Sequence, residues 1–304
     1  MRCHLVPHLG HIHVAKLTAV DIDDVYARLL RRGGRDDRPL SPATVHRVHV
    51  VLHRALSQAV RWEWIWTNPA STATPPRLEP AEIRPPSADS VAALLESVRG
   101  TDPALFTYLR LAVCTGARRS QLLALRWDEV DLARGAIAFT RALVEGPDGP
   151  ELRPTENRRS YRVALDADTL AVVDEHWRRV LQLANTADIE APGERFVFSR
   201  GSDGVDPWRP NLVTKRFIRA RRAAGLPQFR LHDLRHFMAT QMLAAGVPIA
   251  TVSQRLSHAR ASTTLNVYAH AVPGGDEEAA ETLARILASG RRSVMPESRR
   301  RAIG

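Results

Sequence analysis

Cysteine and long apolar runs are both scarce in this chain of 304 residues. Its two cysteines, Cys3 and Cys114, form neither a disulfide framework nor a metal-ligand spacing, which favours a reducing compartment. No run of about eighteen apolar residues is present to span a membrane, and no basic start followed by an apolar stretch indicates a signal peptide. We therefore expect a soluble protein of the cytoplasm with no membrane partner.

Lysine is also scarce, although the chain is strongly basic. Lys16 and Lys215 are the only lysines among 43 basic residues, which outnumber 33 acidic residues and give a formal net charge of +10. Such a balance favours a nucleic acid as partner, because neutralised phosphates release their counterions. The planar arginine group also suits pairs of phosphate oxygens, but a GC-rich genome would explain most of the arginine bias by itself.

A proline-rich segment divides the chain. Five prolines fall between residues 75 and 86, so we assign residues 73–86 to a linker. Before it, residues 1–72 form a small unit with helices predicted at 16–32 and 40–64, capped by Thr18 and Ser41. After it, residues 87–290 form a larger unit, and residues 291–304 form a basic tail.

The larger unit reads as mainly α with a small antiparallel β-sheet. Its β-strands are predicted at 135–140 and 161–165, with a turn at 145–150 and a lone apolar strand at 195–199. An amphipathic helix is predicted near 276–289. The other predicted helices cover residues 87–99, 103–114, 167–184, 209–224, 232–245, 248–256 and 261–269.

The segment "RLHDLRHFMATQML" places His232 and His236 four residues apart, as in the H-E-x-x-H helix of zinc proteases. Arg235 would hold a permanent positive charge beside the dication, and the adjacent acid is Asp233 rather than a glutamate. We therefore expect no metal there. A histidine stripe on the second helix is interpreted as a polar face, wet or touching DNA, in preference to a metal site; it consists of His46, His49 and His53.

The segment "RWEWIWTNP" places three tryptophans within five residues. Exposed indole rings at this point could stack on bases. Core packing at the end of a helix is the alternative, and we expect the tryptophans to belong to the core.

Five other residues make up an inventory suited to attack on a phosphodiester without a metal. Two arginines neutralise the non-bridging oxygens, two histidines exchange protons or hydrogen bonds, and a phenol oxygen is the nucleophile. One arginine follows a glycine turn at the start of a helix, where main-chain amides also attract anions. These residues are Arg118, His232, Arg235, His258 and Tyr268.

The order T-G-x-R, then H-x-L-R-H, then L-x-H followed by T-T-x-x-x-Y resembles the tyrosine recombinases, the phage-integrase family. The resemblance covers residues from about 18 to 290. It implies a helical core-binding domain, truncated at its N-terminus, followed by an α+β catalytic domain. It also implies that Arg118 and Arg235 clamp the phosphate and that His232 assists proton transfer from the tyrosine. His258 then braces the phosphate, and Tyr268 is the nucleophile.

The resemblance further implies an integrase of a phage or other mobile element. It would cleave and rejoin double-stranded DNA at attachment sites through a 3′-phosphotyrosine, without metal, ATP or any cofactor. A homotetramer on DNA is expected, with an excisionase or a host DNA-bending protein as possible helpers.

Three features depart from the family pattern. Gln121 occupies a position that is often glutamate or aspartate, and Thr155 or Glu156 stands where a hairpin lysine is expected. The chain before the core-binding helices is also short. A relative that binds DNA without cleaving it is therefore an alternative, as is a type IB topoisomerase, which the core-binding helix pair disfavours.

Overall fold

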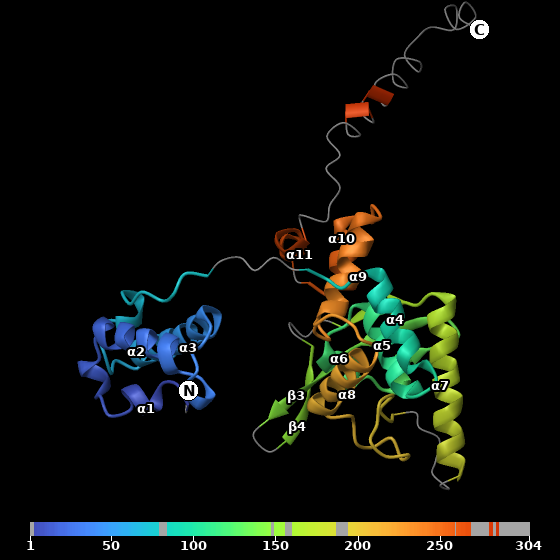
Figure 1. Cartoon of the computed structure of the whole chain (residues 1–304), viewed down its shortest axis with the longest axis horizontal. Coiled ribbons are helices and arrows are strands. Elements are labelled where there is room, and N and C mark those ends of the chain that lie inside the picture. The colour runs from blue at the N-terminus through green and yellow to red at the C-terminus, as the bar shows by residue number, and fades with distance from the viewer. Residues whose placement is uncertain are drawn as a thin grey trace, which may run out of the picture. The chain divides into compact units, whose positions relative to one another are not determined.

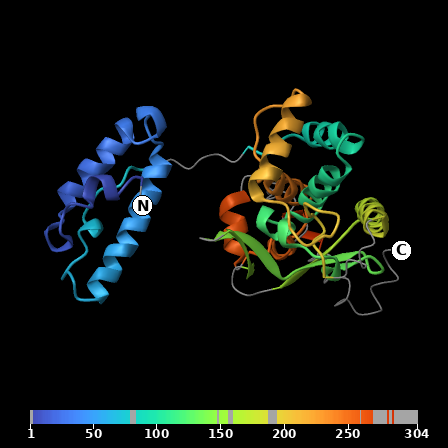
Figure 2. The same cartoon turned by 90° about the horizontal axis from the view of Figure 1, so that it is seen from below.

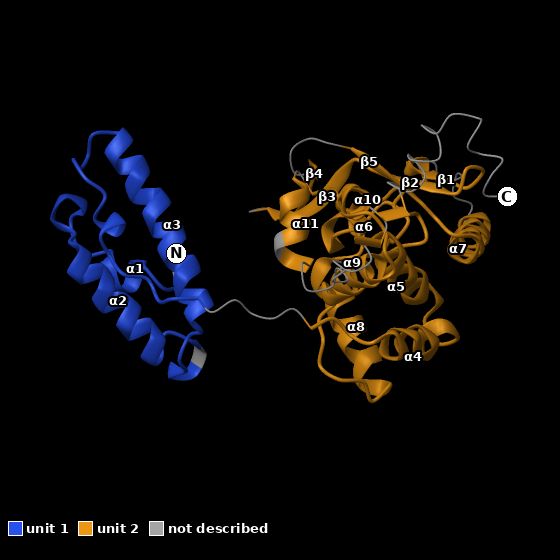
Figure 3. Cartoon of the chain, turned by 90° about the horizontal axis from the view of Figure 1, so that it is seen from above, with its two compact units in different colours: residues 1–82 blue, residues 83–304 orange. Residues whose placement is uncertain are grey.

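The computed structural model describes residues 3–78, 84–146, 149–155, 160–186, 194–258 and 260–268, with 280–281 and 284–285. The chain forms two compact units, residues 1–82 and 83–304 (Figure 3). Among the described residues, no helix is long and apolar enough to cross a membrane. Most of the helix predicted near 276–289 and all of the basic tail at 291–304 lie outside the described residues.

The first unit is helical, with α1 at Val6–Leu9, α2 at Ala19–Arg32 and α3 at Pro42–Arg61 (Figure 1). The Thr18 side chain accepts the Asp21 N–H at 3.3 Å, and the Asp21 carboxylate accepts the Thr18 N–H at 2.9 Å. This reciprocal capping starts α2 as the sequence predicts. The core of the first unit contains Ile22, Val25, Tyr26 and Leu29 from α2, and Val45, Leu52, Leu56 and Ala59 from α3.

The expected core packing of the three tryptophans is wrong. Trp62, Trp64 and Trp66 have 57%, 61% and 98% of their surface exposed. The chain turns at Glu63, whose φ of 58° is left-handed, and within residues 62–66 only Ile65 enters the core. A helix end that turns this sharply leaves one inward position, and the smaller aliphatic side chain occupies it.

The second unit is built around α5 (Pro103–Thr115), which packs against α4, α7 and α9 (Figures 1 and 2). Apolar residues surround most of this helix, which is why it lies in the core rather than on the surface. The other helices are α4 (Ala88–Arg99), α6 (Arg119–Ala124), α7 (Ala167–Thr186), α8 (Pro210–Ala223), α9 (Asp233–Ala244), α10 (Ile249–Arg255) and α11 (Ala261–Tyr268).

The strands form two small antiparallel sheets, which Figure 2 shows along one side of the unit. One sheet has the order β1-β2-β5, from Val130–Asp131, Ala136–Phe139 and Tyr161–Ala164. The other is a hairpin of β3 (Arg141–Gly146) and β4 (Gly149–Pro154). The predicted fold class, mainly α with a small antiparallel sheet, is confirmed.

The lone strand predicted at 195–199 is wrong. This segment makes only isolated bridges, between Arg126 and Phe196 and between Ser199 and Pro207. Phe196, Val197 and Phe198 are nevertheless buried. Its apolar run therefore reflects burial of an irregular segment, which periodicity alone does not distinguish from a short buried strand.

Candidate active site

The segment that carries Arg118 is fixed by a glycine and a glutamine. Helix α5 ends at Gly116, which has a left-handed φ of 62°, and a Cβ at this position would collide with the side chain of Met238. Arg118 is the N-cap residue of α6, and its main-chain N–H donates to Gln121 Oε1 at 2.9 Å. Gln121 thus holds the start of the helix with a neutral amide in place of the carboxylate expected from the family pattern.

Arg235 connects two segments that are distant in the sequence. Its guanidinium donates to the carbonyl of Gly116 and, at 2.7 Å, to the carbonyl of Leu256. The same group lies 2.9 Å from Nε2 of His258. Because a guanidinium can only donate, His258 Nε2 accepts, and the protonated Nδ1 donates to Thr264 Oγ1 at 2.7 Å. Arg235 therefore brings the T-G-x-R segment and the His258 segment together.

Both predicted histidines are neutral at neutral pH. Burial, together with the nearby His236, Arg235 and Arg118, lowers the pKa of His232 to about 4. Burial also lowers the pKa of His258 to about 4, with the positive charges of Arg235 and Arg118 acting in the same direction. Arg118 thus acts electrostatically on both histidines, which places four of the predicted residues in one site.

An open cleft of about 440 Å³ lies next to this cluster. Among its lining residues are three arginines and no carboxylate, so its charge suits a phosphate group. The lining consists of Arg118, Arg119, Ser120, Thr214, Arg230, Leu231 and His232.

Tyr268 ends α11 and is only 1% exposed. It packs in an apolar cluster with Met238, Leu243 and Val252. Burial raises the pKa of its hydroxyl to about 12, although the charge of Arg235 opposes this. The phenol is therefore neutral and largely covered by protein.

His236 contacts the Tyr268 hydroxyl, with 2.7 Å between its Nδ1 and the phenol oxygen. The sequence motif suggests a role for His236 only as a metal ligand and does not predict this contact. His232 lies behind it, with 5.0 Å between the two ring centroids. The spacing of two histidines on one helix face was visible in the sequence, but which of them meets the tyrosine depends on how α9 and α11 pack.

Of the two candidate positions for the hairpin lysine, one lies within the described residues. Thr155 is 3% exposed, and its main-chain N–H donates to the Thr140 carbonyl at 3.2 Å. Glu156, the other candidate position, lies outside the described residues. Lys215 lines a separate hollow on α8 with Arg219 and Arg222.

A second phenol, Tyr161 on β5, lies near the two arginines. Its hydroxyl donates to Gln121 Oε1 at 3.0 Å. Burial raises the pKa of Tyr161 to about 12, while Arg235 and Arg118 act to lower it. Tyr161 belongs to none of the recognised motifs, so the sequence alone does not indicate its place near the site.

The groups considered as metal ligands have other contacts. Asp233 accepts the main-chain N–H of Arg230 at 2.7 Å. In the stripe on α3, His49 contacts the Tyr26 hydroxyl at 2.8 Å and His53 contacts Ser71 Oγ at 3.2 Å. Among the described residues, no group of three histidine, cysteine or acidic side chains could hold a metal ion.

Comparison with known proteins identifies the chain. The phage integrase family matches residues 87–273. The prophage phiRv2 integrase of Mycobacterium tuberculosis is 24% identical over 94% of this chain and 73% of its own length. The Tn1549 transposon integrase, solved with transposon right end DNA, has a TM-score of 0.71 and 18% identity over 91% of this chain and 88% of its own.

A lambda integrase tetramer bound to a Holliday junction has a TM-score of 0.53 and 20% identity over 82% of this chain and 64% of its own. The structural likenesses show the fold, and the family match covers more than half of the sequence. The chain belongs to the phage integrase family, and it is a site-specific DNA recombinase of the tyrosine type.

Proposed function

We propose that Tyr268 cleaves duplex DNA at the attachment sites of a mobile element and forms a 3′-phosphotyrosine. This proposal rests on the hydrogen bond between the Tyr268 hydroxyl and His236. Arg235 and His258, which contact each other, belong to the same site. A phenol, neutral histidines and arginines in this arrangement can transfer a phosphodiester without a metal.

The arginine-lined cleft receives the scissile phosphate in this proposal. Arg118 lines the cleft, and the charge of Arg235 reaches His232, which also lines it. Both arginines stabilise the negative charge that develops on the non-bridging oxygens as phosphorus becomes five-coordinate. Arg235 holds His258 in one tautomer, and His258 Nε2 in turn holds the Arg235 guanidinium in place beside the phosphate.

The nucleophile must lose a proton before it can attack. Because the pKa of Tyr268 is about 12, its hydroxyl is protonated at neutral pH and needs a base. We assign His236 as this base, since its Nδ1 lies 2.7 Å from the phenol oxygen. His232, to which the family resemblance assigns this role, would then hold the His236 ring in place through the contact between the two rings.

The bonds exchange in one displacement. The Tyr268 oxygen bonds to phosphorus, the bond from phosphorus to the 5′-oxygen breaks, and the leaving oxygen takes a proton. Attack by the 5′-hydroxyl of a partner strand reverses these changes and releases the tyrosine. Bond energy is kept in the phosphotyrosine, so neither ATP nor a metal is required.

Duplex DNA is the proposed partner, and four protomers are proposed to act together. The Tn1549 integrase was solved with transposon DNA and lambda integrase as a tetramer on a Holliday junction, which supports both points for this chain. An excisionase or a host DNA-bending protein is proposed as a helper.

The direct test uses a nicked duplex that carries the junction sequence of the element, so that the cleaved fragment is lost and the adduct is trapped. The native chain should give a protein–DNA band on a denaturing gel. Tyr268→Phe should give no such band while retaining its affinity for the duplex. An adduct formed by Tyr268→Phe would overturn the assignment of the nucleophile.

A second candidate is a protein that binds DNA without cleaving it. Buried Thr155 favours it, because no ammonium group stands at the one described position where the family pattern places the leaving-group acid. The same experiment separates the two functions, since a pure binding protein retards the duplex but yields no adduct.

A further inference from the structure

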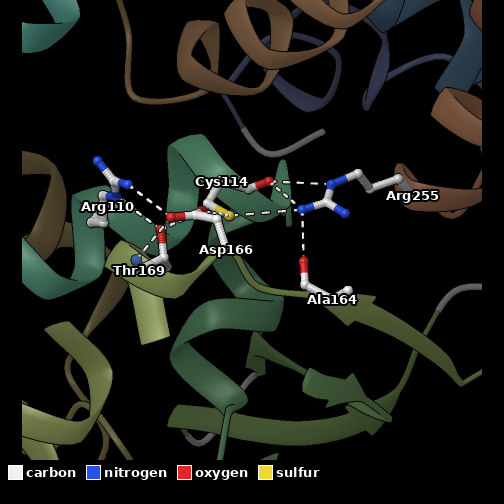
Figure 4. Close-up of polar contacts among 6 residues, drawn as sticks. All are labelled: Arg110, Cys114, Ala164, Asp166, Thr169 and Arg255. Atoms are coloured by element: carbon white, nitrogen blue, oxygen red, sulfur yellow. Dashed lines mark hydrogen bonds and ion pairs between the residues drawn. The ribbon is translucent and has the colours of Figure 1, made fainter. Parts of the chain in front are cut away.

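A second arginine, Arg255, connects the segments around the site at a point that the mechanism does not use. Arg255 is the last residue of α10. Its Nε and one terminal nitrogen donate to the Cys114 carbonyl at 3.2 and 2.9 Å, and the same terminal nitrogen donates to the Ala164 carbonyl at 2.9 Å. Figure 4 shows these contacts, which join α10 to the end of α5 and to the end of β5.

Each connected segment carries a residue of the proposed site. Cys114 lies four residues before Arg118, and Arg255 lies three residues before His258. Ala164 ends the strand that begins with Tyr161, whose hydroxyl holds Gln121. The guanidinium of Arg255 therefore fixes the relative positions of three segments.

Arg235 joins two of the same segments within two residues of the Arg255 contacts. It binds the carbonyls of Gly116 and Leu256, whereas Arg255 binds the carbonyl of Cys114. The two arginines thus hold α5 and α10 together at successive points. In the proposed mechanism Arg235 contacts the reacting phosphate. Arg255 binds only main-chain carbonyls in the contacts described above.

Cys114, whose carbonyl Arg255 binds, is also held through its side chain. The Cys114 thiol donates to Asp166 Oδ2 at 3.3 Å, and Arg110 forms an ion pair with Asp166 at 3.1 Å (Figure 4). Burial opposes ionisation of Asp166, but hydrogen bonds from Thr169 and Cys114 and the charge of Arg110 hold its pKa below the ordinary value. Burial raises the pKa of Cys114, so the thiol stays protonated and donates.

We propose that Arg255 is a positioning residue for strand cleavage, which it promotes by holding the Arg118 segment at a fixed distance from the His258 segment. This inference rests on the proposed function. A displacement of about 1 Å at a reacting centre can lower a rate by about 10²-fold. Arg255 is therefore expected to affect the chemical step and not the affinity for DNA.

The first experiment measures adduct formation in a single turnover at saturating nicked duplex. Arg255→Met should react about 10²-fold more slowly, in line with the cost of misplacing a catalytic group. Arg255→Lys should lie between Arg255→Met and the native chain, because an ammonium keeps the charge but lacks the fork that binds two carbonyls. The dissociation constant for the duplex should change by less than about 2-fold, within the range of a surface substitution.

Arg178→Met is the matched control. Arg178 is an exposed arginine on α7 that pairs with Asp174 one helical turn away. Its removal should leave cleavage at the native rate. A native rate in both Arg255 variants would overturn the inference.

A second substrate distinguishes positioning from general loss of structure. It carries a methylphosphonate at the scissile position, which removes the negative charge of the phosphodiester that Arg118 is proposed to offset. If Arg255 acts through the Arg118 segment, the rate loss in Arg255→Lys should shrink on this substrate, as it should in Arg118→Ala. An equal loss on both substrates, accompanied by a lower melting temperature, would assign Arg255 a structural role only and refute the proposal.

The outcome for the native chain separates this inference from the function on which it rests. A native chain that forms no adduct with the junction duplex contradicts the proposed function itself. If the native chain forms the adduct and both Arg255→Met and Arg255→Lys form it at the native rate, only the role of Arg255 is contradicted.

Discussion

His236 lies against the Tyr268 hydroxyl, with 2.7 Å between Nδ1 and the phenol oxygen, whereas His232 contacts the ring of His236. A base that takes the phenol proton typically contributes about 10²–10⁴-fold to a rate. His236→Gln should therefore slow adduct formation by that factor, and His232→Gln should slow it less. Single-turnover rates at saturating DNA measure both. A larger loss in His232→Gln would return the role of base to the histidine selected by the sequence motif.

Removal of either clamping arginine should impair cleavage, but the two variants should differ in stability. Loss of one preorganised charge contact costs about 10²–10³-fold in rate. Arg118→Ala and Arg235→Ala should both show at least this loss. Arg219→Ala, at an exposed position of α8, is the control.

Arg235→Ala should also lower the free energy of unfolding by about 1–3 kcal/mol, because it leaves the buried carbonyls of Gly116 and Leu256 without donors. Arg118→Ala should lower it less, because the Arg118 side chain lines the open cleft. Urea denaturation measures the difference, and equal stability of the two variants would contradict the bridging role of Arg235.

Acid should destabilise the second unit through His232 and His258, whose lowered pKa values keep them neutral in the folded chain. The pKa values of His232 and His258 are lowered from 6.5 to about 4 in the folded chain. Between these values the unfolded chain binds more protons than the folded chain, so the free energy of unfolding falls as the pH is lowered from about 6.5 to about 4. Below about 4 these two groups contribute no further loss.

Thermal melting between pH 4 and 8 measures this dependence. The variant His258→Gln should show a shallower decline, because one of the two lowered pKa values is gone. An unchanged decline in this variant would mean that His258 is not held neutral by its surroundings.

Local features of the sequence were enough to predict most helices. Thr18 and Ser41 mark the starts of α2 and α3 because capping depends on residues close in the chain. The left-handed turn at Gly116 could likewise be predicted from a single glycine before a helix.

Features that depend on packing between distant segments could not be predicted in this way. The hydrogen-bond partner of Tyr268 is decided by the contact of α9 with α11. The two residues in this contact, His236 and Tyr268, are 32 residues apart in the sequence. The exposure of Trp66 depends on the turn at Glu63, and the burial of residues 196–198 without a strand depends on neighbouring loops. A turn is predicted at 145–150, but β3 and β4 on its two sides are not. The mostly exposed β4 lacks the alternation of apolar and polar residues that indicates a strand.

The leaving 5′-oxygen needs a proton, and the position where a lysine is expected holds buried Thr155. A lost general acid costs about 10²–10⁴-fold in rate. We therefore predict slow cleavage of an ordinary duplex, and nearly normal cleavage of a duplex with sulfur at the 5′-bridging position, whose leaving group needs no proton. Thr155→Lys should accelerate the ordinary substrate and leave the sulfur substrate little changed.

Tyr161 offers the specific alternative for that proton. Its phenol lies near Arg118 and Arg235, and its pKa of about 12 keeps it protonated yet still more acidic than an alcohol. If Tyr161 is the acid, the native chain cleaves both substrates at similar rates, and Tyr161→Phe slows only the ordinary duplex. If Tyr161 only holds Gln121 in place, Tyr161→Phe slows both substrates equally. Comparison of the two substrates in the native chain, Thr155→Lys and Tyr161→Phe therefore decides whether this chain lacks a leaving-group acid or has replaced the lysine with a tyrosine.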